Sequence, residues 1–347
     1  MAKEKQPIDN SEEIFNHVTT PWLTPFYQHL QNTYQQGRFP HGLLFTGSDG
    51  IGKFKVAKQV AQYLLCTDKQ DNDACFKCHS CLLMKANNHL DYYFLEAEKN
   101  KSIGIDQVRL LTEKLNERPQ LGNNKVVLLK GAEQLTEAAA NALLKTLEEP
   151  QGDSYLILLA RTHHQLMPTL LSRLQQTHLH SPDDQTLINW LYELGYQVSD
   201  LGVLRWFQNS PLSLLNHLKA LQEDASLDTR RQCVEGLFSL LYQPVNLFKF
   251  SQLLAANVEQ NLLLLFHLLH DIHKLKINKN QLNNDAIYYF ALPQLQQWQL
   301  QLSLKSLRLL SEEILKTRSL LTAHSSLKKE LLINALLIKI KNEFKEV

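Results

Sequence analysis

The sequence carries almost no excess of charge of either sign. Its 36 basic side chains face 35 acidic ones, so the formal net charge is +1. A protein that binds nucleic acid unaided usually has a basic surplus that displaces counterions from phosphates. We therefore expect no strong binding to DNA by the isolated chain. A local basic patch, or DNA binding as part of a larger assembly, stays open.

Long apolar runs are also missing. No run approaches the roughly 20 residues that cross a bilayer, and the polar stretch 1–11 lacks the apolar centre of a signal peptide. We therefore expect a cytoplasmic protein. With 44% hydrophobic and 20% charged residues, the composition is that of a folded globular chain. A length of 347 residues suits two or three domains.

Cysteine is scarce, yet four of the five cysteines lie close together with the spacing C-x8-C-x2-C-x2-C. Disulfides are rare in a reducing compartment, whereas this spacing brings thiolates within reach of one tetrahedral ion. We predict a structural Zn²⁺ site, with unligated cysteines as the alternative. Its ligands would be Cys66, Cys75, Cys78 and Cys81. We expect His79 to be exposed rather than a ligand, and Cys233 to be a core residue.

The first half of the chain alternates short apolar runs with helical patterns. Runs of this length predict buried parallel strands with helices on both faces, at 42–46, 92–95, 125–129 and 155–160. A helix is predicted over Glu137–Glu148, capped by Thr136 and ended by Pro150. Its buried face would hold Ala140, Leu143, Leu144 and Leu147, and another face Asn141, Lys145 and Glu148.

The strand signals fade after about residue 182. A short helical stretch to about residue 222 precedes a Leu-rich, almost glycine-free segment that should be entirely helical. Within it, 261–270 is apolar on more than one face, which fits either a core helix or a helix packed on partner chains. The simpler interpretation is a core helix. We predict domains at 1–180, with a cysteine module at about 66–90, then 181–222 and 223–347.

A glycine-rich loop follows the first predicted strand and precedes a helix. Gly47, Gly50 and Gly52 would let backbone N–H groups surround a phosphate, and Lys53 would reach the outer phosphates. The next position, which needs a hydroxyl to hold Mg²⁺, is Phe54. The matching second strand ends in Lys130-Gly131 and supplies neither of the carboxylates that hydrolysis needs. We predict no hydrolysis, and leave ATP binding at the loop open.

Three motifs in order resemble those of the bacterial clamp-loader AAA+ subunits. The stretch 141–150 (NALLKTLEEP) resembles the hallmark helix of that family, and Leu171-Ser172-Arg173 resembles its SRC motif, with Leu174 in place of cysteine. The cysteine insertion matches in position and spacing. The resemblance covers essentially the whole chain. It implies an AAA+ P-loop α/β domain with a parallel sheet, a small helical lid and an all-α collar that joins subunits into a ring.

Within this family the sequence resembles the non-hydrolysing type of subunit. A gamma/tau motor subunit would carry an intact loop, an Asp-Glu pair at Lys130-Gly131 and a sensor-2 arginine where Leu212 falls. The stretches 21–23 and 91–93 also resemble the non-hydrolysing type. The implied partners are the gamma/tau motor and delta subunits of DNA polymerase III, with the sliding clamp and primer-template DNA reached through the complex.

The matched motifs imply that Arg173 is an arginine finger, delivered in trans to ATP bound by a neighbouring motor subunit. Lys145 and Thr169 would approach the same nucleotide. A surface arginine in a salt bridge, and a solvated Lys145, are the alternatives from the residues alone. We expect no intrinsic enzyme activity. Two other functions remain as alternatives: an ATP-hydrolysing motor subunit, and a zinc-containing nucleic-acid-binding module.

Overall fold

The computed structural model describes residues 20–70, 73–98, 101–122, 124–150, 152–224, 227–243, 247–278, 281–323 and 327–344. The polar N-terminal stretch lies outside them. Contacts divide the chain into two compact units. The first is Met1–Thr186 with Ser210–Ser213, and the second is Leu187–Asn209 with Leu214–Val347. The division into three domains stays a prediction.

The first unit is built on a parallel five-stranded sheet of order β2-β3-β4-β1-β5. The strands are β1 (Gly42–Thr46), β2 (Tyr92–Glu96), β3 (Asn124–Lys130), β4 (Asp153–Ala160) and β5 (Gln175–His178). The four strands predicted from apolar runs are confirmed. No apolar run predicted β5, because Gln175–His178 is polar. This edge strand forms by pairing with β1, where Gln175 lies opposite Leu43.

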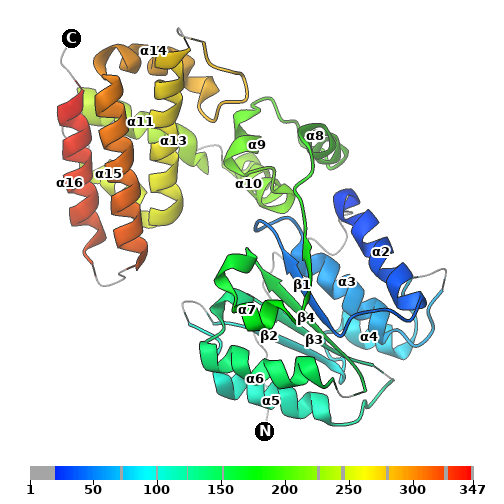
Figure 1. Ribbon diagram of the computed structural model, residues 1–347. Helices are drawn as coiled ribbons and strands as arrows, with labels where there is room; N and C mark the ends of the chain where they lie inside the picture. Colours follow the sequence, from blue (N-terminus) through cyan, green and yellow to red (C-terminus); the bar gives the residue numbers. More distant parts are fainter. Residues whose placement is uncertain are drawn as a thin grey trace. The chain divides into compact units, whose positions relative to one another are not determined.

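Helices cover both faces of this sheet (Figure 1). On one face, Leu43 and Phe45 of β1 pack with α2 (Thr24–Gln35) and α3 (Lys53–Leu65). On the other face, Leu44 packs with α5 (Ile105–Asn116) and α6 (Glu137–Glu148). Alternate residues of one strand thus point into two different cores. The strands therefore read as continuous apolar runs rather than as alternating ones.

Helix α6 has the bounds that the sequence predicted. The hydroxyl of Thr136 accepts a hydrogen bond from the N–H of Ala139 at 3.2 Å, which confirms the N-cap. Leu143 is fully buried in the α5–α6 core, and Asn141, Lys145 and Glu148 are exposed. Shorter elements connect the rest of the unit: η1 (Pro21–Leu23), α4 (His79–Lys85), η2 (Ala132–Gln134), η3 (His163–Gln165) and α7 (Pro168–Leu171).

The described residues after β5 form helices joined by loops, with no strand among them. Its helices are α8 (Asp184–Glu193), α9 (Gly202–Trp206), α10 (Pro211–Glu223), α11 (Thr229–Tyr242), α12 (Leu247–Ala256), α13 (Val258–Ile277), η6 (Tyr289–Ala291), α14 (Leu292–Gln301), α15 (Leu304–Ala323) and α16 (Lys329–Glu343). Helix α13 contacts α11, α12, α14 and α15 and buries leucines on several sides. The apolar stretch 261–270 is therefore a core helix. None of the described helices combines the length and hydropathy needed to cross a bilayer.

A buried arginine joins three parts of the second unit. Arg230 is 3% exposed, and its Nη1 lies 2.7 Å from the carboxylate of Asp200. Its Nη2 lies 3.5 Å from the carboxylate of Asp228. The guanidinium also lies 5.5 Å from the ring centroid of Trp206 and 5.2 Å from that of Phe290. Two carboxylates and two aromatic faces together stabilise a charge that burial alone would disfavour.

Candidate functional site

The glycine loop between β1 and α3 is closed by its own lysine. The ammonium of Lys53 donates to the backbone oxygens of Gly47 at 2.7 Å and Ser48 at 3.0 Å, and lies 3.5 Å from the carboxylate of Asp49. Burial lowers the pKa of Lys53 below its ordinary value, and the nearby Asp49 opposes that shift. The strand, loop and helix thus stand in the order that the sequence predicted, with the lysine turned onto the loop.

The start of α10 packs on the same loop. The N–H of Leu212 donates to the backbone oxygen of Gly50 at 2.9 Å, and the hydroxyl of Ser210 donates to the backbone oxygen of Asp49. Gly50 has φ of +77°, and a Cβ at this position would overlap the Ser213 hydroxyl. Glycine at position 50 therefore allows the start of α10 to pack closely against the loop. Leu212, at the predicted sensor-2 position, places an aliphatic side chain beside the loop.

The positions that hold metal in a hydrolytic P-loop carry an aromatic ring and an ammonium group. The ring of Phe54 lies 5.4 Å from that of Phe94, centroid to centroid. The ammonium of Lys130 lies 5.5 Å from the Phe54 ring centroid and 2.8 Å from the carboxylate of Glu96. Neither Phe54 nor Lys130 can ligate Mg²⁺, since one has no donor atom and the other is a cation.

One acidic residue in this region escaped the sequence analysis. Glu133 lies in η2, just after β3, and lines a cavity of about 750 Å³ together with Lys53, Phe54 and Lys130. Its Oε2 is buried and has no hydrogen-bond partner among the described residues. From sequence alone, an acidic residue three positions beyond a strand end is a weak indication of a residue at the site. Only the turn of η2 brings Glu133 back towards the glycine loop.

Arg173 lies in the turn that follows α7, and Glu148 ends α6. The Nε of Arg173 donates to the Oε1 of Glu148 at 2.7 Å, and Nη2 pairs with the same oxygen. Nη1 donates to the backbone oxygen of Thr169 at 2.8 Å and to the hydroxyl of Ser172 at 3.2 Å. The structure thus brings Thr169 and Arg173 together. Lys145 is exposed, and its side chain has no hydrogen bond or ion pair within the described part of the chain.

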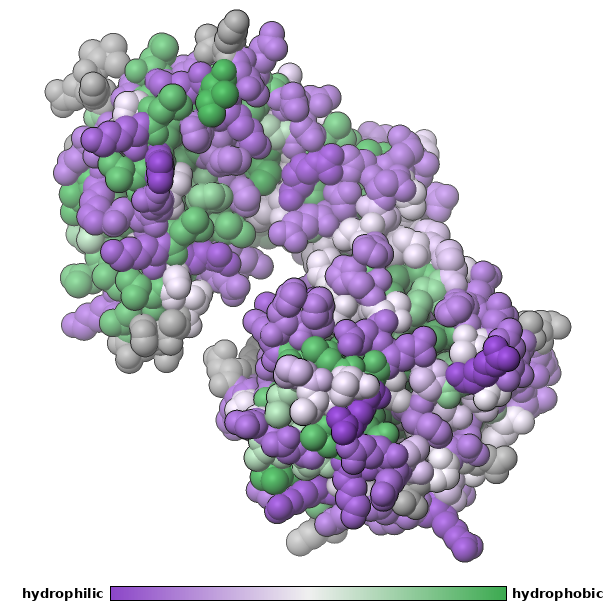
Figure 2. All heavy atoms as spheres, viewed as in Figure 1, coloured by the Kyte–Doolittle hydropathy of each residue, from purple (hydrophilic) through white to green (hydrophobic). Residues whose placement is uncertain are grey.

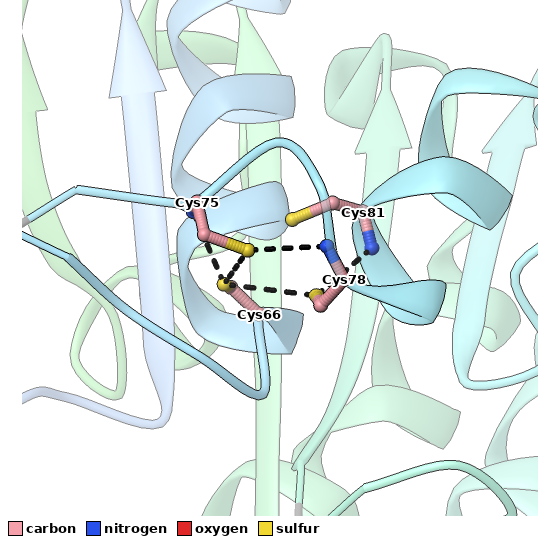
Figure 3. Close-up of side chains that lie close together, drawn as sticks. All are labelled: Cys66, Cys75, Cys78 and Cys81. Atoms are coloured by element: carbon pink, nitrogen blue, oxygen red, sulfur yellow. Dashed lines mark hydrogen bonds between the residues drawn. The ribbon is translucent and has the colours of Figure 1, made fainter.

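The four clustered cysteines converge on one point (Figure 3). Their sulfur atoms all lie within 4.8 Å of one another, and three of the four residues are buried. The sulfur of Cys66 is 3.6 Å from that of Cys75 and 3.9 Å from that of Cys78. A tetrahedral Zn²⁺ with bonds of about 2.3 Å separates its sulfur ligands by about 3.8 Å. The cluster can hold a metal ion of this kind, and its sulfur atoms are too far apart for disulfides.

Backbone geometry sets the cysteines in place. Cys78 and Cys81 each donate a backbone N–H to the sulfur three residues earlier, at 3.2 Å and 3.4 Å. Phe76 reaches φ of +56°, which turns the chain sharply after Cys75. His79 is exposed and is not one of the four converging residues, and Cys233 is buried in the helical unit. Both expectations are confirmed.

A buried serine–histidine pair anchors the cysteine module. The Nδ1 of His89 accepts a hydrogen bond from the backbone N–H of Asp91 at 3.1 Å, so the hydrogen of the neutral ring is on Nε2. That Nε2 lies 2.7 Å from the Ser80 hydroxyl, which donates in turn to the backbone oxygen of Leu65 at 2.7 Å. Burial lowers the pKa of His89, which favours this neutral form. Because the Nε2 that faces Ser80 carries the hydrogen, it cannot take a proton from the Ser80 hydroxyl. The pair serves as a structural link.

The sheet order and the strand–glycine loop–helix unit define a parallel α/β protein with a phosphate-loop turn. Three curated relatives, each named DNA polymerase III subunit delta', are similar to this chain. The Escherichia coli K12 protein is 42% identical over 194 residues, or 55% of this chain and 58% of that protein. The Haemophilus influenzae protein is 42% identical over 171 residues, or 49% of this chain and 52% of that protein. The Pseudomonas aeruginosa protein is 35% identical over 237 residues, or 65% of this chain and 68% of that protein.

The family described as "DNA polymerase III, delta subunit" matches residues 22–183. The chain belongs to the family of DNA polymerase III delta-prime subunits. The chain spans only a little more than half the length of the E. coli and H. influenzae relatives that it matches. The residues matched by the family, 22–183, include the sheet, the glycine loop and Arg173.

Proposed function

We propose that this chain acts as the non-hydrolysing delta-prime subunit of a DNA polymerase III clamp loader. In this role it supports ATP-dependent loading of the sliding clamp onto primed DNA in the cytoplasm, next to gamma/tau motor and delta subunits. Family membership supports the assignment. The observation that carries the non-hydrolysing role is the contact of Lys130 with Phe54, where a motor subunit needs metal ligands.

A hydrolytic P-loop needs a hydroxyl and acidic side chains around Mg²⁺. Of the carboxylates that line the loop cavity, Asp49 is paired with Arg161 at 2.7 Å and Glu96 with Lys130. Glu133 alone does not replace a hydroxyl and an acidic pair, and the ammonium of Lys130 repels a divalent cation. These contacts favour a chain that depends on its neighbours for ATP turnover. They leave binding of a nucleotide to this loop open.

The proposed contribution to catalysis is made in trans by Arg173. Its side chain is 34% exposed, so another subunit can reach it. A guanidinium placed on the γ-phosphate would stabilise the charge of the transition state, an effect worth about 10³- to 10⁵-fold in rate in other P-loop proteins. Thr169 contacts Arg173 through its backbone oxygen. Lys145, exposed on α6, is proposed to approach the same nucleotide.

The helical unit is proposed to form the collar that contacts other subunits. Figure 2 shows apolar side chains reaching the surface of this unit among polar ones. Large exposed apolar residues on α15 and α16 include Leu309, Leu315, Leu320, Leu331 and Ile338. Such groups favour burial against a partner. Helix α13, in contrast, is already covered by its own unit.

The cysteine module is proposed to hold structural Zn²⁺ through Cys66, Cys75, Cys78 and Cys81. The sulfur separations fit the donor set. When bound, the ion would cross-link the end of α3 to the start of α4 and stabilise a short segment that has little core of its own. Four protein ligands leave no position for a reacting water, so its role is structural.

The test is DNA- and clamp-stimulated ATPase activity of a reconstituted loader containing either the native chain or Arg173→Ala. We expect the variant to assemble normally and to lose most of the stimulated turnover, with the chain alone inactive. Unchanged turnover in a fully assembled complex would contradict the finger role. Turnover by the chain alone would favour the motor alternative. Tight, salt-sensitive DNA binding by the chain alone would favour the nucleic-acid-binding module.

A further inference from the structure

All three nitrogens of the Arg173 guanidinium contact oxygen atoms of its own unit. Nε and Nη2 both contact the Glu148 carboxylate, with Nε at 2.7 Å from Oε1. Nη1 is held by two neutral acceptors, the backbone oxygen of Thr169 and the hydroxyl of Ser172. Every nitrogen of the group therefore has an oxygen partner, and Nε and Nη2 share the same carboxylate oxygen. A phosphate that binds through the Nε–Nη2 edge of the guanidinium must replace Glu148.

The two sides of the guanidinium differ in how readily they can be replaced. Thr169 offers a backbone oxygen within α7, and the Ser172 hydroxyl donates to that same oxygen at 2.9 Å. Glu148 offers a side chain that is 48% exposed and is attached to a different helix. A carboxylate and a phosphate carry the same sign of charge and compete for the same planar fork. The Glu148 side is therefore the one that opens.

We propose that Glu148 is a positioning residue that holds Arg173 against its own chain and releases it when the γ-phosphate of a neighbouring nucleotide competes. This inference rests on the proposed function. Contacts with Thr169 and Ser172 keep the guanidinium oriented while the carboxylate is exchanged for phosphate. Loss of the Glu148 charge removes the competitor. The finger then engages the γ-phosphate without first having to displace the carboxylate.

The first measurement is the accessibility of Arg173 in the full chain. Phenylglyoxal reacts with free guanidinium groups, and mass spectrometry of digested protein gives the rate at each arginine. Glu148→Gln keeps the size of the side chain and removes its charge, so we expect Arg173 to react severalfold faster. Glu148→Asp keeps the charge on a shorter side chain and should fall between. Glu149→Gln is the matched control, because Glu149 is exposed and its side chain has no partner within the described residues.

The second measurement is ATPase activity of the reconstituted loader. With Glu148→Gln we expect turnover without DNA and clamp to rise at least threefold and the KM for ATP to fall. The stimulated kcat should change by less than twofold. Glu149→Gln should match the native complex in all three quantities. Arg173→Ala in the Glu148→Gln background should remove the gain, since the carboxylate acts only through the arginine.

The outcomes separate this inference from the proposed function. If Arg173→Ala lowers stimulated turnover but Glu148→Gln matches the native chain in both measurements, the finger role of Arg173 is supported and the positioning role of Glu148 is wrong. A faster reaction of Arg173 with phenylglyoxal but unchanged unstimulated turnover also contradicts the positioning role of Glu148. Release of Arg173 from Glu148 would then have no effect on the nucleotide. If Arg173→Ala leaves stimulated turnover unchanged, the finger role fails and the inference fails with it.

Discussion

Lys130 and Phe54 meet at the mouth of the glycine loop, with the ammonium of Lys130 5.5 Å from the centroid of the Phe54 ring. They come from different elements, the end of β3 and the start of α3. A cation over the face of an aromatic ring is an attractive contact. Here it fills the place where a P-loop ATPase collects a hydroxyl and acidic groups around Mg²⁺. Neither Phe54 nor Lys130 offers a ligand atom for Mg²⁺ at this point of the loop.

Restoring these ligands should increase metal-dependent nucleotide binding. We expect the double variant Phe54→Thr/Lys130→Asp to bind ATP in the presence of Mg²⁺ at least about tenfold more tightly than the native chain, a gain of about 1.4 kcal/mol. Isothermal titration calorimetry with and without Mg²⁺ measures the difference. The double variant Phe54→Leu/Lys130→Met removes the same contact but adds no ligand, so it should show no Mg²⁺-dependent gain. Equal gains in both variants would contradict the argument.

The cysteine cluster should contain one Zn²⁺ per chain. Cys78→Ser and Cys81→Ser should each lower the zinc content measured by mass spectrometry of the metal and should destabilise the module. The expected loss of folding free energy is large, because Zn²⁺ binding to zinc-finger peptides contributes on the order of 10 kcal/mol. His79→Ala is the control, since His79 is exposed beside the cluster. A native chain that folds with no bound metal would rule out the zinc assignment.

Arg230 should be one of the most sensitive positions in the helical unit. Arg230→Ala leaves the carboxylates of Asp200 and Asp228 without their buried partner, so we expect a loss of about 3–5 kcal/mol in the free energy of unfolding. Denaturant unfolding measures it. The neighbouring Arg231 pairs with the same Asp228 at 3.4 Å, but its side chain is 63% exposed. Arg231→Ala should cost less than about 1 kcal/mol. Similar losses from both variants would show that burial is not the deciding factor.

Stability should fall in mild acid partly because of His217. This ring packs against Trp206 and Phe207, and burial lowers its pKa in the folded chain below the ordinary value of 6.5. Protonation therefore favours the unfolded chain, whose histidine binds a proton more readily. The stabilisation is complete above the unfolded pKa and is lost as pH falls through the lower folded pKa.

The His217→Phe variant removes this titration and keeps an aromatic ring in place. Urea unfolding at pH 7.5 and at pH 5 gives the free energy of unfolding of both proteins. We expect the native chain to lose more stability than the variant between these two pH values. Parallel losses would assign the acid sensitivity to other groups, such as His267 and His270, whose pKa values burial also lowers.

Much of the α/β unit could be predicted from local patterns. The runs that form β1 to β4 are apolar throughout because helices cover both faces of the sheet, and α6 begins at a Thr136 cap. The cysteine spacing likewise predicted a convergence that the sulfur positions bear out. In each case the signal lies within a few residues of the element or cluster that it describes.

The sequence by itself determined the type of these elements, the cysteine cluster and the absence of metal ligands at Phe54 and Lys130. Only the tertiary structure decided the pairing of β5, the partners of Asp91 and the partner of Arg173, because these contacts join residues far apart in the chain. Strand β5 is polar and exists only through its pairing with β1. The buried carboxylate of Asp91 accepts from the backbone N–H groups of Gln120 and Leu121, both at 2.8 Å. Glu148 meets Arg173 only because α6 packs on α7, and no local pattern marks one as the partner of the other.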